Sequence, residues 1–191
     1  MSNNLKQILL LFIATLSPFH HAQAAPLTYN DVAPIFLGRC MMCHMPNGIM
    51  GDPPENYRLD SYVETLSKSD RARVVPGNAL ASELYRRIKG YAKPRMPFNG
   101  PPFLSEVEVD RIAQWINDGA RDANGNLAPD ISGSRVRLHG QLTELWALDG
   151  LKLSIHSGTR IKKNPAIGSY VRVQGIVGKN AEIHVDRIKR R

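Results

Sequence analysis

The chain has 191 residues, of which 42% are hydrophobic and 22% charged, with 15 glycines and 13 prolines. This composition is typical of a folded protein and excludes disordered, collagen-like and coiled-coil chains. The formal net charge of +8 comes entirely from the last third of the chain. Residues 135–191 contain twelve Lys and Arg but four Asp and Glu, whereas residues 1–134 contain thirteen of each.

The first apolar run, from Ile8 to Leu16, is shorter than the roughly 20 residues that span a bilayer. Lys6 precedes this run, and Ala22-Gln23-Ala24 follows it as a small-residue cleavage site. This order is typical of a signal peptide. We therefore predict that residues 1–24 are removed on export. The mature chain is then a periplasmic protein without a transmembrane segment, in an oxidising compartment.

Apolar residues of segment 25–121 recur with a helical period. The clearest helix begins after Ser105, which forms a capping-box pattern with Glu108, and ends at Gly119. Further helices are expected from Val32 towards Cys40, over residues 61–67 and over residues 82–88. The pattern predicts an all-α domain with long loops.

Residues 122–134 are rich in Asp, Asn, Gly, Pro and Ser and predict a linker. After the linker the apolar period changes to two, beginning with Val136 and Leu138, which predicts β-strands. The pair Asp149-Gly150 is a signal for a two-residue hairpin turn. Five or six short strands in residues 135–191 leave exposed edges and little core unless the sheet closes. We therefore predict a separate, small all-β domain with an OB-like barrel.

Both cysteines of the chain lie in the motif Cys40-Met41-Met42-Cys43-His44. The spacing is that of covalent haem attachment, in which two thiols hold the porphyrin and the next histidine binds the iron. A disulfide, a redox-active cysteine pair and a zinc site are the alternatives. A thioredoxin-like pair follows a strand in a βαβ unit, and zinc needs a second pair of ligands. The sequence predicts neither, so we expect one covalently attached haem c.

The second axial ligand of the iron is expected to be a methionine, because thioether sulfur stabilises ferrous iron. Methionines inside or beside the attachment motif are too close to His44 to reach the opposite face of the porphyrin. Met96 is the best candidate, because Pro97 keeps it extended and Pro94 stiffens the approach. Met50, in a separate loop, is the alternative.

Seven segments occur in an order that resembles small mono-haem c-type cytochromes. They are Tyr29–Phe36, Cys40–His44, Arg58–Tyr62, Val74–Asn78, Ser82–Arg87, Arg95–Pro97 and Ala113–Ala120. Over residues 28–121 the chain is most similar to the planctomycete-type cytochrome c domain. The resemblance implies covalent haem at Cys40 and Cys43, with His44 as proximal and Met96 as distal ligand. It also implies a cytochrome c-like all-α fold.

Other conspicuous residues are expected to have structural or solvated roles. After Met96 the chain departs from the pattern of these cytochromes, because it has Pro97-Phe98-Asn99 where they often have Pro-Pro. Trp115 is expected to pack between helices rather than to touch a haem edge, and Arg95 to be solvated rather than to pair with a propionate. The strand period places three histidines on the outer face of the barrel: His139, His156 and His184.

Single-electron transfer is the predicted function, and we expect an electron carrier rather than an enzyme. The basic barrel is expected to dock on a redox partner with an acidic surface. An anionic membrane surface or a polyanion is the alternative target, whereas nucleic acid is not expected for an exported protein. Two other functions stay open. One is a binding module whose main activity lies in the barrel, and the other is a peroxidase-like haem enzyme or sensor with an open sixth site.

Overall fold

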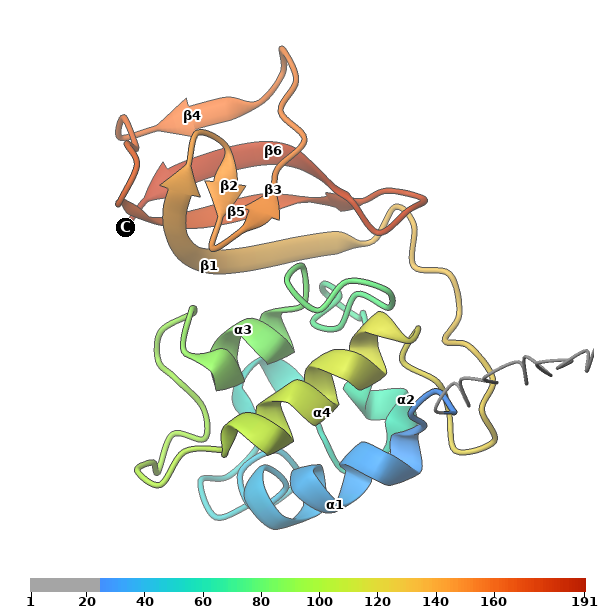
Figure 1. Ribbon diagram of the computed structural model, residues 1–191. Coiled ribbons are helices and arrows are strands. Elements are labelled where there is room, and N and C mark those ends of the chain that lie inside the picture. Colours follow the sequence, from blue (N-terminus) through green and yellow to red (C-terminus); the bar gives the residue numbers. More distant parts are fainter. Residues whose placement is uncertain (1–24) are drawn as a thin grey trace, which may run out of the picture.

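The computed structural model describes residues 25–191, and the predicted signal peptide, residues 1–24, lies outside the described residues. Helices come first and strands follow (Figure 1). The helices are α1 (Tyr29–Arg39), the 3₁₀ helix η1 (Pro54–Asn56), α2 (Tyr62–Thr65), α3 (Glu83–Lys89) and α4 (Glu106–Asn117). The strands are β1 (Arg135–Glu144), β2 (Ala147–Leu148), β3 (Leu151–Lys152), β4 (Arg160–Lys162), β5 (Tyr170–Val177) and β6 (Ile183–Arg190).

Helix α4 begins with the predicted capping box. The Ser105 hydroxyl accepts a hydrogen bond from the Glu108 N–H at 3.3 Å, and the Glu108 carboxylate accepts one from the Ser105 N–H at 2.8 Å. These bonds satisfy main-chain donors that have no partner within the helix. The apolar face of α4 is buried, and Trp115 packs edge-on against Phe36 of α1 with ring centroids 6.1 Å apart. The expected helix is therefore confirmed.

The strands form one six-stranded sheet with the order β3-β2-β1-β5-β6-β4. Strands β2 and β3 are joined by the predicted hairpin turn, whose residues Asp149 and Gly150 have φ angles of 45° and 84°. Such positive φ angles match the turn type that suits the twist of a hairpin. Strand β4 pairs in parallel with β6, whereas the other neighbours are antiparallel. The sheet is therefore mixed.

The predicted fold class, an all-α cytochrome c-like domain followed by a separate OB-like barrel, was wrong. The four α-helices have only 11, 4, 7 and 12 residues, and long loops connect them. Proline and glycine interrupt helices between Lys93 and Pro102, because proline lacks the N–H that a helix interior needs. Strands β3 and β4 lie at the two ends of the strand order, and closure into a barrel is not confirmed.

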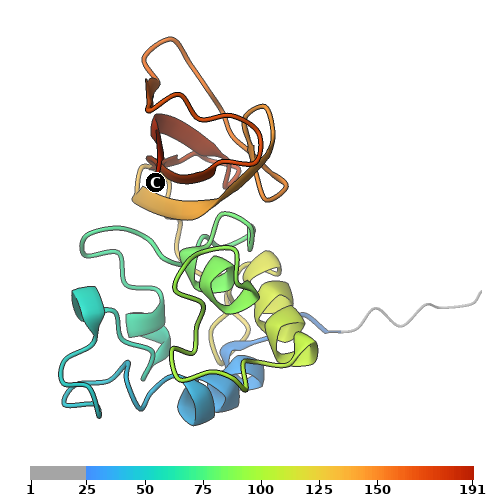
Figure 2. The same ribbon diagram turned by 90° about the vertical axis from the view of Figure 1, so that its left-hand side faces the viewer.

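The helical part completes the buried core of the sheet. Ala72, Val75 and Ala81 lie in the same buried cluster as Leu138 and Val173 of the sheet. Figure 2 shows loops of the helical part lying directly against the sheet. The helical part therefore supplies core residues to the sheet.

Among residues 25–191, no helix has the length and apolar character needed to cross a membrane.

Candidate functional site

A pocket of about 540 Å³ lies between the helical part and strand β1. All the predicted haem-binding residues line it: Cys40, Cys43, His44 and Met96. The alternative ligand Met50 also lines it. The volume is within the range of ligand and cofactor sites in proteins. Residues separated by more than 50 positions are thus brought to one cavity, which we call the motif pocket.

The imidazole of His44 is held in one orientation by the main chain. Its Nδ1 lies 2.8 Å from the carbonyl oxygen of Tyr57, whose own hydroxyl donates to the Thr65 carbonyl at 3.1 Å. Because a carbonyl oxygen can only accept, Nδ1 must carry the hydrogen. The lone pair of a neutral His44 is then on Nε2, the atom available to a metal. A hydrogen bond of this kind is the usual means by which a protein orients a metal-binding histidine.

The two cysteines lie in the turn that follows helix α1. The Cys43 N–H donates to the Cys40 carbonyl at 3.1 Å, and both thiols are free and partly exposed. Burial raises the pKa of the Cys40 thiol to about 12. Reactive cysteines in redox pairs have a lowered pKa, because the thiolate is the nucleophile. The environment of Cys40 therefore disfavours the alternative of a redox-active pair.

The two candidate methionine ligands differ in how firmly they are held. Met96 packs against the core of the helical part, and its N–H donates to the Arg87 carbonyl at 3.0 Å. Met50 is 65% exposed. A ligand that must stay in place is better provided by the packed side chain, so the arrangement favours Met96.

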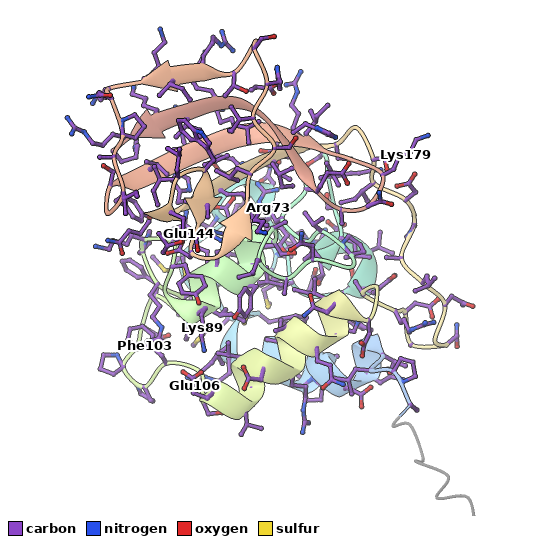
Figure 3. The ribbon with its side chains drawn as sticks, turned by 45° about the horizontal axis from the view of Figure 1, so that its top comes forward. Arg73, Lys89, Phe103, Glu106, Glu144 and Lys179 are labelled. Carbon is purple, nitrogen blue, oxygen red and sulfur yellow. The ribbon has the colours of Figure 1, made fainter. Side chains whose placement is uncertain are left out.

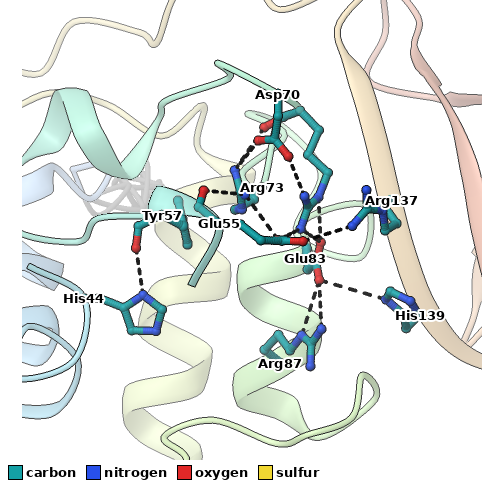
Figure 4. Close-up of polar contacts among 10 residues, drawn as sticks. His44, Glu55, Tyr57, Asp70, Arg73, Glu83, Arg87, Arg137 and His139 are labelled. Atoms are coloured by element: carbon teal, nitrogen blue, oxygen red, sulfur yellow. Dashed lines mark hydrogen bonds and ion pairs between the residues drawn. The ribbon is translucent and has the colours of Figure 1, made fainter. Parts of the chain in front are cut away.

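Ionic side chains form one wall of the motif pocket (Figure 4). Arg71 pairs with Glu55 and lies 3.3 Å from Glu83, and its side chain is only 6% exposed. Glu55 also pairs with Arg137 of β1 at 3.0 Å, and Glu83 with Arg87 at 3.1 Å. The hydrogen bond from Arg71 and its charge hold the pKa of Glu55 below its usual range. The Glu55 carboxylate is therefore ionised at neutral pH. We call this group of paired side chains the ionic wall.

Two members of this wall come from the sheet, and the sequence analysis missed them. Arg137 and His139 of β1 both line the motif pocket. His139 was expected on the outer face of a barrel, and it does alternate with the apolar residues of β1. At this point of the strand, however, it meets the helical part, with its Nδ1 3.9 Å from the Glu83 carboxylate. Burial lowers the pKa of His139 to about 4, so its side chain is neutral at pH 7. Strand parity gives the face of a side chain but not what covers that face.

Trp115 and Arg95, which were not expected to contact a haem, lie outside the motif pocket. Trp115 is completely buried in the helical core, where its indole N–H donates to the Arg121 carbonyl at 2.9 Å. Arg95 lies over the ring of Phe103, 4.3 Å from its centroid. Neither residue lines the motif pocket. The packing role expected for Trp115 is confirmed.

The donor set and charges of the motif pocket fit a covalently bound haem. Two thiols, one imidazole with a free Nε2 and one packed thioether are the attachment groups and axial ligands that a c-type haem requires. The pocket is also lined by more arginines than carboxylates, and a haem carries two propionates that such an excess stabilises. The lining arginines are Arg39, Arg71, Arg73, Arg87 and Arg137, against Asp52, Glu55 and Glu83.

Among residues 25–191, no three or more His, Cys, Asp and Glu side chains are grouped as a metal site would require. Comparison with known proteins finds no match: no family model, no curated protein and no solved structure is similar to this chain.

Proposed function

We propose that the motif pocket holds one haem c and that the protein is a periplasmic carrier of single electrons. The observation that carries this proposal is the convergence of the attachment motif and Met96 on one pocket, with Nε2 of His44 free. The haem, when bound, supplies an iron that changes between its ferrous and ferric states. Export of the chain, predicted from residues 1–24, agrees with the compartment in which such a carrier works.

The residues of the pocket each have a distinct task in this proposal. Cys40 and Cys43 would hold the haem through thioether bonds and so prevent its loss. His44 and Met96 would ligate the haem iron, and a substrate would then have no free position on it. The Tyr57 carbonyl fixes the orientation of the His44 ring.

The ionic wall has two effects on a bound cofactor. Its arginines offer planar donors that match the carboxylate groups of propionates. Arg71 and Arg73 are held nearly buried by Glu55 and Asp70, so little rearrangement is needed when an anionic group enters. Because strand β1 contributes Arg137 to this wall, the sheet takes part in the cofactor site and not only in docking.

Mass spectrometry of the chain matured in a host with haem-attachment machinery tests the proposal. We expect the mass of the mature chain plus one haem, and a haem stain that persists on a denaturing gel. The variants Cys40→Ser and Cys43→Ser should each lose normal two-bond attachment. Met42→Ala, in the same motif but not a ligand, is the matched control and should retain it. Bare thiols or a disulfide in the wild-type chain would contradict the proposal.

The absorption spectrum separates an electron carrier from a haem enzyme. A low-spin ferric spectrum with the band of methionine–iron ligation supports the carrier. A high-spin spectrum that shifts on addition of peroxide or carbon monoxide would support an enzyme or sensor with an open sixth position.

We also propose that the basic sheet guides the carrier to a redox partner with an acidic surface, because twelve of the 25 Lys and Arg lie in residues 135–191. Electrostatic docking of this kind is weakened by salt. The rate of reduction by a periplasmic or membrane donor should therefore fall as ionic strength rises, and equal rates at low and high salt would contradict docking by charge.

A further inference from the structure

Two cross-strand rows on the polar face of the sheet are rich in lysine and arginine. On each strand, the residues that alternate with the buried ones point to this face. Residues that are paired across neighbouring strands lie on the same face. One cross-strand row runs from Arg137 through Gln174 to Arg187 and Arg160. The next row consists of His139, Arg172, Lys189 and Lys162. Figure 3 shows many nitrogen-tipped side chains around β4 and β6.

This arrangement is unfavourable for an isolated sheet. Like charges directly opposite each other in neighbouring strands repel, and Arg187 and Arg160 are such a pair. Burial lowers the pKa of Arg172, and the positive charges of Arg191, Arg137 and Arg187 lower it further. A surface that only had to be soluble does not require cations in register across several strands.

The first row borders a cleft of about 490 Å³, distinct in most of its lining from the motif pocket. Five arginines line it, from the loop before α3 and from strands β1, β4 and β6: Arg71, Arg135, Arg137, Arg160 and Arg187. Two carboxylates also line it. Asp70 is already paired with Arg71 and Arg73, whereas Asp186 is exposed and forms no ion pair among residues 25–191.

Several of these guanidinium groups lack partners. Among the residues that the structure describes, Arg135, Arg160 and Arg187 form neither an ion pair nor a side-chain hydrogen bond. The Nε atoms of Arg137 and Arg187 are buried, and neither finds a hydrogen-bond partner within segment 25–191. Buried donors without partners are costly in folded proteins. Two of the four such arginine Nε atoms within residues 25–191 lie at the wall of this cleft, where an anionic ligand would give them partners.

We propose that this cleft binds a small multivalent oxyanion of the phosphate type. Three unpaired arginines against Asp186 leave an excess of two positive charges, which a dianion or a more highly charged group neutralises. Guanidinium groups form paired hydrogen bonds with phosphate and carboxylate oxygens, and their approach from both sides of a cleft suits a compact ligand with several oxygens. The inference needs no haem in the motif pocket and stands apart from the proposed electron transfer.

Calorimetric titration of the full mature chain with pyrophosphate tests the site. We expect saturable one-site binding, and about tenfold weaker binding for Arg187→Gln and for Arg160→Gln. Arg190→Gln is the matched control. Arg190 lies on the same strand, but it pairs with Val171, so it alternates to the face opposite Arg187. Its affinity should be unchanged. Because the Arg160 and Arg187 side chains hold no other residue in place, both variants should fold, which circular dichroism checks.

Three further results decide the source and nature of the ligand. Vesicles with phosphatidylglycerol that bind the wild type but not Arg187→Gln, without binding of soluble pyrophosphate, would assign the site to a lipid phosphate. Equal weakening by Arg190→Gln and Arg187→Gln would show only diffuse charge attraction and overturn the site. Binding of a polyglutamate chain with no binding of pyrophosphate or vesicles would also overturn it, in favour of a protein-docking face.

Discussion

The guanidinium of Arg86 is completely buried between helix α3 and the sheet, where it pairs with the carboxylate of Asp149 in the β2–β3 turn. It also donates to the main-chain carbonyls of His139 at 2.9 Å and Leu80 at 3.0 Å. Every nitrogen of the guanidinium therefore has a partner inside the molecule. The contact joins the helical part to the sheet at the strand that also supplies Arg137 to the motif pocket.

Replacement of Arg86 by alanine should lower the free energy of unfolding by about 3–5 kcal/mol, because it leaves the Asp149 carboxylate buried and unpaired. Urea denaturation followed by circular dichroism measures the loss. Lys89→Ala is the matched control on the same helix: its partner Glu106 is exposed, and such surface pairs contribute at most about 1 kcal/mol. Similar losses for the two variants would show that Arg86 does not join the two parts of the fold.

His139 should make the protein sensitive to acid. Burial lowers its pKa from 6.5 to about 4, so the unfolded chain binds a proton more readily between these values. The stabilising effect of a neutral, buried His139 is complete above pH 6.5 and is lost as pH falls towards 4. Over this range the unfolded chain takes up a proton that the folded chain does not, so the free energy of unfolding falls by proton linkage.

The variant His139→Gln tests this, because it cannot titrate. Its free energy of unfolding should decline less than that of the wild type between pH 6.5 and pH 4.5. His156→Gln, which removes an exposed histidine from the same part of the chain, should follow the wild type. A wild-type decline that both variants reproduce would assign the acid sensitivity to other groups.

Met96 and Met50 are distinguished by paired substitution. Met96→Ala should abolish the ferric absorption band of methionine–iron ligation and lower the reduction potential, because the thioether favours ferrous iron. Met50→Ala removes an exposed side chain from the same pocket and should leave both properties unchanged. The reverse result would make Met50 the ligand.

Trp115→Phe should affect stability but not the absorption spectrum. The substitution loses the hydrogen bond to the Arg121 carbonyl and leaves space in a completely buried site, at a cost of about 2 kcal/mol. Thermal unfolding measures this loss. A changed haem spectrum with unaltered stability would contradict the packing role.

Local patterns in the chain were sufficient for several elements. The capping box at Ser105 and the Asp149-Gly150 hairpin both formed as expected, because each depends on residues within a few positions of one another. The attachment motif is local in the same sense. Its relation to Met96 is not local. Met96 could still be chosen from the sequence because few methionines were candidates, and it does line the same pocket as the motif.

Only the tertiary structure decided how the strands and helices share their surfaces. Ala72 and Val75 complete the core of the sheet, and Arg137 enters the wall of the motif pocket. Alternation along β1 shows that Arg137 and His139 lie on the polar face, but whether that face meets water or a helix depends on packing between distant segments. The chain by itself therefore determined its motif, its turns and its caps. The shared core and the ionic wall arose from contacts between distant segments, which no short pattern contains.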